Sequence, residues 1–362
     1  MRPESSGHLA KSGRPWGLIA FWVLILSGTA AGCAYLQFLG PPPPDFESTP
    51  VPIKVGPQAA PHPATTSQQA ASPTPAPPAT LADAAPPLTT PPIAGPNPKL
   101  LAASAIDAQW QVPKIAADGA MPMQAYAASQ LPPPDAAILP PDVPRVAVVI
   151  AGLGDDAVLY QMAAHLPPEF SLALSPYGKN VAAAAATARE NGHETLLLLP
   201  MPGLLAGAPQ SQNQATLDWS MAQFQGYAGV TDAFGPAMGG GFMTNAAAKT
   251  WLMTNIARQG LFYIEGDPAA HPAPYAAGRD ADIVIDASDG PAAETGELAA
   301  LVTTAESQHA ALAIVLNPTP DALDILDNWS ATLVNQDILL VPVSALVQPP
   351  DVPYKLYAST KQ

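Results

Sequence analysis

The chain has 362 residues, of which 48% are hydrophobic and 12% are charged, so part of it is expected to lie in a membrane or in low-complexity sequence. Its 14 basic and 29 acidic residues give a net charge of −15, which would repel a phosphate backbone. Nucleic acid is therefore not expected as a partner. The single cysteine, Cys33, excludes an intramolecular disulfide and every multi-cysteine metal site.

The amino terminus has the pattern of a membrane anchor. Residues 1–15 form a basic tail with Arg2, Lys11 and Arg14, and residues 16–40 carry no charge. A helix of that length would reach about 37 Å, which is enough to cross a bilayer. Because basic flanks stay in the cytoplasm, we expect a single-pass inner-membrane protein with its remaining residues in the periplasm. The alternatives are a cleaved signal peptide, giving a secreted form, and a lipoprotein signal acylated at Cys33.

The segment after the expected anchor is rich in proline. Residues 41–144 hold 27 of the 46 prolines, with alanine, threonine and serine filling much of the rest. Such a segment buries too little apolar surface to offset its ordering entropy, so it is predicted to be a disordered Pro/Ala-rich linker. The stretch 100–123 is less proline-rich and contains Trp110 and Ile115. This stretch either docks on the folded part as a short helix or is unstructured.

Residues 145–348 are expected to form one α/β domain, followed by a tail at 349–362. Short apolar runs alternate here with Ala-rich stretches of helical length, a pattern typical of repeated βα units with a parallel sheet. Strands are predicted at 146–150, 170–174, 195–199, 260–264, 283–285, 312–316 and 338–341, and helices at 157–166, 181–191, 246–259, 292–309 and 320–333. An irregular (β/α) barrel fits this order best, and a doubly wound open sheet is the alternative. In either fold a ligand would bind at the carboxyl ends of the strands.

The residues that follow these strands include few of the usual catalytic groups. Gly152-Leu-Gly154 matches part of a dinucleotide fingerprint, but Asp155 and Asp156 would then face the phosphates. Capping of the following helix is the expected role of the two aspartates. The candidate pocket residues are Asp155, Asp156, Tyr177, His193, Glu265, Asp267 and Asn317.

Two of these candidates have both a chemical and a structural interpretation. Glu265 and Asp267 are suited to acid–base catalysis on a sugar, but carboxylates at a strand end also cap helices. His193 stands near the start of a strand and is expected to tether the helix–strand corner through hydrogen bonds. No two histidines of the domain lie within four residues of each other, so no helical pair of zinc ligands is predicted.

Several stretches of the domain occur in an order and spacing that resemble a known family. They are Val148-Val-Ile-Ala-Gly-Leu-Gly154, Leu172-Ala-Leu-Ser-Pro-Tyr177, Gly192-His-Glu-Thr-Leu-Leu-Leu-Leu-Pro-Met201, Met238-Gly239, Gly260-Leu-Phe-Tyr263 and Val341-Pro-Val-Ser344. Together they resemble the divergent polysaccharide deacetylases, relatives of the NodB-like carbohydrate deacetylases, over nearly all of residues 145–346. The resemblance implies a deviant (β/α) barrel. It also implies that active members bind a divalent metal through one aspartate and two histidines and remove acyl groups from amino sugars.

The chain departs from the family pattern at the positions that would carry this chemistry. Where the family has Ile-Asp-Asp-Leu-Gly after the first strand, this chain has Ala151 and Gly152 in place of the two aspartates. Leu198 and Pro202 replace the histidine and glutamate of His-Leu-Pro-Met-Glu-Pro, and Ala237 replaces the histidine of Asn-His-Met-Gly. The late Gly-His-Pro becomes Leu316-Asn317-Pro318. No catalytic residue, metal ligand or cofactor is therefore predicted.

These observations lead to an expectation about function. We expect a membrane-anchored periplasmic deacetylase-like domain without metal-dependent catalysis, which binds peptidoglycan or another envelope glycan, or an envelope protein. Tyr177, Tyr263 and Trp219 are candidates for stacking on a sugar, whereas Leu198 and Met201 would fill the former pocket of a purely structural protein. The alternative is an active carbohydrate N-deacetylase with a rearranged site, and only that alternative would need zinc or another divalent metal.

Overall fold

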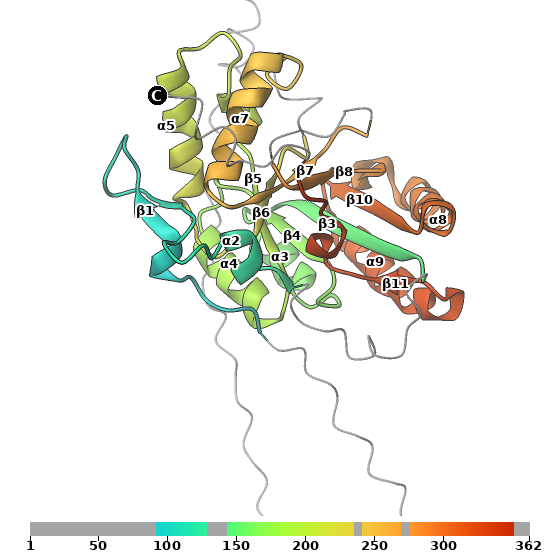
Figure 1. Cartoon of the computed structure of the whole chain (residues 1–362). Coiled ribbons are helices and arrows are strands. Elements are labelled where there is room, and N and C mark those ends of the chain that lie inside the picture. The colour runs from blue at the N-terminus through green and yellow to red at the C-terminus, as the bar shows by residue number, and fades with distance from the viewer. Residues whose placement is uncertain (1–91, 129–142, 235–240, 269–275, 351–362) are drawn as a thin grey trace, which may run out of the picture. The chain divides into compact units, whose positions relative to one another are not determined.

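The computed structural model describes residues 92–128, 143–234, 241–268 and 276–350, all of which fall within one compact unit, Leu81–Gln362 (Figure 1). The expected basic tail, the expected anchor at 16–40 and Ala237 lie outside the described residues. Within these described ranges, no helix is both long and apolar enough to cross a membrane.

A parallel sheet forms the centre of the unit, with strand order β8-β7-β6-β5-β4-β3-β10-β9. Every pairing along this order is parallel, and β11 pairs with the first residues of β3, ahead of the part of β3 that pairs with β4. The strands are β3 (Arg145–Leu153), β4 (Ser171–Leu174), β5 (Thr195–Leu198), β6 (Gly229–Thr231), β7 (Phe262–Glu265), β8 (Gly278–Asp280), β9 (Ile283–Asp286), β10 (Ala310–Leu316) and β11 (Leu339–Leu340).

The two outer strands of this order are neighbours in the chain. Only Ala281 and Asp282 separate β8 from β9, and the amide of Ala281 donates to Glu265 O of β7 while the amide of Asp282 donates to Leu312 O of β10. One extended segment therefore borders both β7 and β10. The result is a parallel-sheet half-barrel with α/β order, consistent with the expected deacetylase-type barrel and not with the alternative of a doubly wound sheet.

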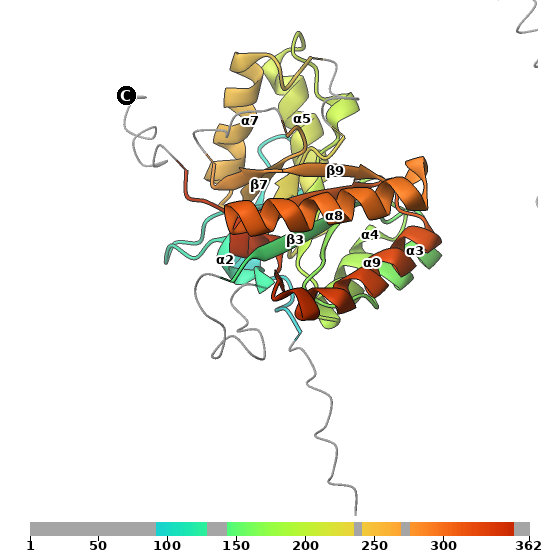
Figure 2. The same cartoon turned by 90° about the vertical axis from the view of Figure 1, so that its right-hand side faces the viewer.

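Helices cover the outside of the strands, and α5 and α7 stand side by side (Figures 1 and 2). Those that follow strands are α3 (Ala157–Ala163), α4 (Val181–Glu190), α5 (Gln210–Met221), α7 (Ala246–Arg258), α8 (Pro291–Gln308) and α9 (Pro320–Leu333). Short 3-10 turns lie at Met201–Gly203, Ala287–Asp289, Val334–Gln336 and Val343–Leu346. Because the paired strands of this sheet are parallel, every strand delivers its carboxyl end to the same rim of the sheet.

Side chains that alternate between the two faces of the sheet form two separate apolar clusters. Val148 and Ile150 pack with helix residues such as Leu252 of α7, whereas Val149 packs in a second cluster with Ile314. This division follows from the period of two in a strand, which sends successive side chains to opposite faces. The first cluster fills the layer between strands and helices, and the second fills the concave face of the half-barrel.

Residues 92–128, which lie inside the expected linker 41–144, are folded against the domain. An antiparallel hairpin of β1 (Leu101–Ala103) and β2 (Gln111–Pro113) lies between the 3-10 turn η1 (Pro98–Leu100) and the one-turn helix α2 (Pro122–Ala125). Leu100 and Tyr126 are buried, and Ser104 Oγ donates a 2.5 Å hydrogen bond to Asp218 of α5. The disordered interpretation is therefore wrong for this stretch, and docking occurs mainly through a hairpin rather than the expected short helix.

Most predicted elements of the domain are present within a few residues. The helix at 320–333 has the predicted bounds, and the first strand runs on to Leu153. The sequence interpretation missed β6, β8 and α5. β6 has three residues and begins with glycine, and α5 has little apolar periodicity, so neither produces a strong pattern.

Candidate functional site at the carboxyl ends of the strands

The centre of the carboxyl rim is apolar. Ala151 is fully buried at the end of β3, and Leu198 is 9% exposed at the end of β5, both in the concave cluster. Gly152 has φ of +87°, and a Cβ there would lie 3.6 Å from the ring of Phe234, which packs against the same cluster. Leu316 of β10 also packs there. The side chains that gather at this point therefore offer neither a metal ligand nor a general base.

The loops after β3 and β4 are packed directly on each other. The amide of Ser175 donates to Leu153 O at 2.7 Å. A Cβ at Gly178 would lie 2.5 Å from Gly154 O, so only glycine fits at that position. This close approach fixes the position of Tyr177, the residue directly before the glycine.

Tyr177 forms an exposed aromatic pair with Trp219 at this rim. The Tyr177 side chain is 56% exposed, and its ring centroid lies 5.2 Å from that of the partly exposed Trp219 of α5. The two rings are tilted by 41°. Each of these side chains presents an apolar ring face together with a polar group, Tyr O–H or Trp N–H. Pro202 is exposed in the 3-10 turn after β5.

The other rim residues predicted from the sequence serve local structure. Asp156 caps α3 by accepting hydrogen bonds from the amides of Val158 and Leu159 at 2.7 and 3.2 Å, while Asp155 is exposed. Asn317 donates a 3.0 Å hydrogen bond to Asp286. Bonds from Ser288 and Asn317 lower the pKa of the Asp286 carboxyl. Asp156 therefore performs the helix capping expected from the sequence.

Glu265 belongs to a buried carboxyl cluster that the sequence interpretation did not find. It is 2% exposed and accepts a 2.7 Å ion pair from Lys249 of α7, whereas Asp267 is partly exposed and has a partner of its own. Asp232, directly after β6, is fully buried and accepts a 2.7 Å bond from the amide of Gly266. The available signal was the Thr231-Asp232 pair, but β6 itself was not recognised.

The electrostatics of this cluster follow from burial. Desolvation, the charge of Glu265 and a hydrogen bond with it raise the pKa of Asp232 well above its ordinary value, and a bond from Gly266 opposes the shift. Desolvation also raises the pKa of the Tyr263 hydroxyl. For Asp280, desolvation and the nearby charge of Glu265 raise the pKa of the carboxyl to about 6. The shift favours the protonated form of Asp232, and Lys249 pairs with Glu265.

The cluster faces the helix layer and not the rim centre. Glu265 bonds to Lys249 of α7, and Tyr263, which points the same way along β7, packs in the cluster with the helices. The intervening Ile264 packs instead in the concave cluster. Access to Asp232 and Glu265 from the concave side is thus closed by the strands themselves.

His193 lies at the opposite end of the strands from the other candidates. Its Nδ1 is 2.9 Å from Phe170 O, its Nε2 is 3.3 Å from Ala164 O, and the residue is fully buried. Burial lowers the pKa of the imidazole, and the two carbonyl bonds partly oppose this. The tethering role expected from the sequence is what the structure shows.

Glu194, the next residue, is also fully buried at this end. Its carboxyl accepts hydrogen bonds from the amides of Ala128 and Ser344 at 3.0 and 3.1 Å and from Ser171 Oγ at 3.4 Å. Desolvation raises its pKa to about 7 against the effect of these bonds. Glu194 therefore joins the amino-terminal segment and the last 3-10 turn to the sheet.

A family model for divergent polysaccharide deacetylases matches residues 148–347, more than half of the chain. The chain belongs to this family. The matched range begins within β3 and ends just after the last 3-10 turn, so it includes nearly all of the half-barrel described above.

Two solved structures are similar to this chain. An uncharacterized protein from Agrobacterium tumefaciens C58 is 28% identical, with a TM-score of 0.57, and the likeness covers 66% of this chain and 99% of that one. The catalytic domain of a peptidoglycan N-acetylglucosamine deacetylase from Eubacterium rectale ATCC 33656 is 10% identical, with a TM-score of 0.34, covering 58% of this chain and 94% of that one. A TM-score that low supports no argument about function. Among curated proteins, none matches this chain.

The residues at the family's metal positions do not fit a metal ion. Ala151, Gly152 and Leu198 have no coordinating atom in their side chains, and the ring of Phe234 lies over Gly152. In the part of the chain that the structure describes, no three His, Cys, Asp or Glu residues are grouped so as to hold a metal. Zinc prefers imidazole, thiolate and carboxylate ligands, and this rim centre supplies none of them.

Proposed function

We propose that this domain keeps the deacetylase fold as a non-catalytic glycan-binding module. The observation that carries the proposal is the rim centre, where Ala151, Gly152 and Leu198 stand in place of ligands and base. Amide hydrolysis by the family's route needs a metal to acidify water and a base to take the proton, and apolar side chains provide neither.

The exposed pair of Tyr177 and Trp219 supports a glycan as the ligand. It lies on the rim where this fold binds ligands, and the Gly154–Gly178 contact holds its loop in place. The buried Met201 and Leu198 leave the rim centre filled, so the ligand would lie across the surface and not in a deep pocket. Peptidoglycan, an amino-sugar polymer, is the expected glycan if the domain is periplasmic.

The proposal includes the cellular setting expected from the sequence. The uncharged residues 16–40 would anchor the chain in the inner membrane, and the remaining proline-rich residues before 92 would let the domain reach glycan at a distance. No cofactor is part of this proposal.

A second candidate, an active deacetylase with a rearranged site, is favoured by the Asp232–Glu265 pair. Two neighbouring carboxyls with one raised pKa resemble an acid–base pair. Three features weigh against it: both groups are buried, Lys249 engages Glu265, and the pair faces α7. We therefore rank binding above catalysis.

The proposal is tested by measuring whether the protein binds chitooligosaccharides without hydrolysing them. Detergent-solubilised full-length chain is titrated with chitooligosaccharides, and tryptophan fluorescence and acetate release are followed in the same samples. We expect saturable binding without acetate release, and an affinity loss of about tenfold in Tyr177→Ala, since removing one stacked ring is worth on the order of 1 kcal/mol or more. Tyr160→Ala, which removes a partly exposed tyrosine of α3, is the matched control. Acetate release abolished by Glu265→Gln would instead establish the second candidate.

A further inference from the structure

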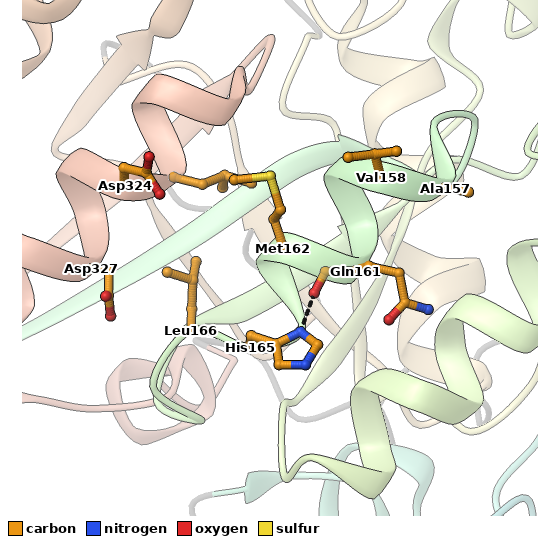
Figure 3. A pocket seen from close by; sticks show the side chains of 9 residues that line it. Ala157, Val158, Gln161, Met162, His165, Leu166, Asp324 and Asp327 are labelled. Carbon is orange, nitrogen blue, oxygen red and sulfur yellow. Dashed lines mark hydrogen bonds between the residues drawn. The ribbon is translucent and has the colours of Figure 1, made fainter. Parts of the chain in front are cut away.

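A hollow between α3 and α9 lies apart from the centre of the rim and from the aromatic pair. It has a volume of about 640 Å³ and is open to solvent. Figure 3 shows the side chains that line it. The residues that line it come from the two helices and the turn after α3: Ala157, Val158, Gln161, Met162, His165, Leu166, Leu323, Asp324 and Asp327. We call this surface the α3–α9 groove.

The floor of the groove is apolar and one of its apolar residues is exposed. Leu166 and Leu323 are buried beneath it, and Met162 is partly buried. Val158 at its edge is 65% exposed, although it is a β-branched apolar residue that gains by burial. A partner that covers Val158 would extend the apolar layer outward from the core.

The α9 wall of the groove is acidic and unneutralised. Asp324 and Asp327 are three residues apart, which puts them on one side of the helix, and both are exposed (Figure 3). Among the described residues, no ion pair involves either aspartate. On the facing wall, His165 Nδ1 is 2.6 Å from Gln161 O, so the imidazole is held by its own helix.

We propose that the α3–α9 groove docks a basic amphipathic helix of a partner protein. Apolar side chains of such a helix would cover Val158 and Met162, and a Lys or Arg on its flank would face Asp324 and Asp327. A groove between two helices can accept a ridge of side chains from a third helix. In binding of this kind, apolar side chains at helical spacing on the third helix contact the groove. A second copy of this chain is a poor occupant, since its net charge of −15 brings acidic surface to an acidic wall.

The proposed partner does not depend on whether the rim binds glycan. The groove lies on the outer helix layer, and none of its residues belongs to the rim centre or to the aromatic pair. The domain could therefore hold glycan at one surface and a protein at the other. Loss of one binding activity would leave the other intact.

The test uses the full-length chain in detergent and a labelled 18-residue Leu–Lys amphipathic helix, with the equivalent Leu–Glu helix for comparison. Fluorescence anisotropy should show binding of the Leu–Lys helix that weakens as salt is raised. In Asp324→Asn/Asp327→Asn we expect a loss of roughly three- to thirtyfold, from two exposed ion pairs. Glu190→Gln/Glu306→Gln removes the same charge at exposed positions outside the groove and should leave binding unchanged.

A second variant separates apolar from charge contributions. Val158→Ser removes exposed apolar surface without touching the aspartates, and it should weaken binding about threefold at every salt concentration. Thermal melting of each variant reports whether the fold is kept. The proposal is overturned if the two charge variants bind alike, if the Leu–Glu helix binds as well, or if a photo-reactive Leu–Lys helix cross-links outside α3 and α9.

Discussion

The two ends of the strands in this domain differ sharply in chemistry. At the amino ends, His193 and Glu194 are buried with hydrogen bonds to carbonyls, amides and a hydroxyl. At the carboxyl ends, where the family fold binds its ligands, the centre of the rim is built from Ala151, Leu198 and Phe234.

This difference indicates what each end does. Burying a carboxyl or an imidazole is costly unless its bonds are satisfied, so the network at the amino ends serves to join segments that are far apart in sequence. The centre of the rim carries no buried ionisable side chain of this kind. The chain keeps the fold of its family, and the residues at the centre of its rim have no coordinating atom in their side chains.

The largest effect is expected at Glu194. Glu194→Ala removes the acceptor of the buried Ala128 amide and of the partly buried Ser344 amide. Each unsatisfied group costs about 1–3 kcal/mol, so we expect a loss of about 4 kcal/mol. Glu190→Ala, an exposed change at the end of α4, should stay within about 0.5 kcal/mol. Urea unfolding of both variants measures the difference, and equal midpoints would show that Glu194 does not join these segments.

The pH dependence of stability gives a second, somewhat smaller effect. The pKa of Glu194 is about 7 in the folded protein against an ordinary 4.5, so the folded state binds the proton more tightly than the unfolded chain. Stability from this group is present below pH 4.5 and is lost as pH rises towards 7.

The change amounts to roughly 3 kcal/mol for a shift of this size. Glu194→Gln should remove that slope while other groups, such as Asp280, titrate alike in both proteins. Unfolding free energies of wild type and variant across this range give the comparison. If the wild type instead became more stable than the variant as pH rises towards 7, the raised pKa of Glu194 would be contradicted.

A third prediction concerns the contact that positions Tyr177. Gly178→Ala places a Cβ 2.5 Å from Gly154 O, and backbone must move to relieve the clash. We expect a loss of about 2 kcal/mol, typical of overpacking, together with weaker chitooligosaccharide binding. Gly207→Ala is the matched control because a Cβ there meets nothing within 4 Å. If melting temperature and chitooligosaccharide binding were unchanged in both variants, the contact between Gly154 and Gly178 would not position Tyr177.

The smallest effect distinguishes two neighbouring aspartates of the rim. Asp156→Ala removes the cap of α3 and should cost about 1 kcal/mol, whereas Asp155→Ala should cost less than about 0.5 kcal/mol. Neither change should alter glycan binding, since neither side chain belongs to the aromatic pair. A binding defect in Asp155→Ala alone would instead make that carboxylate a ligand contact.

The sequence predicted most of the repeated βα order because most of the buried strands are short apolar runs and most of the helices are Ala-rich stretches of helical length between them. It missed β8, whose Gly278–Asp280 sequence is charged, and the hairpin at 101–113, because proline-rich surroundings suggested disorder. Both depend on contacts with distant segments, which local pattern does not encode. The sequence placed Ala151 and Leu198 at the ends of two strands, and both residues lie there in β3 and β5.

The carboxyl cluster shows why the remaining site residues could not be predicted. Asp232 and Lys249 meet Glu265 only because β6, β7 and α7 pack together, and nothing in their spacing along the chain signals that contact. Phe234 covers Gly152 for the same reason. Residues that meet through tertiary packing become visible only in the folded chain.

The central claim, that the rim no longer supports metal catalysis, is tested most directly by metal content and turnover of the full-length chain. The protein is equilibrated with zinc, freed of excess metal, and analysed for bound metal and for acetate release from chitooligosaccharides. We predict less than stoichiometric metal and no acetate release above a Lys249→Met/Glu265→Gln control. One tightly bound zinc per chain, with acetate release that a chelator abolishes, would contradict the account.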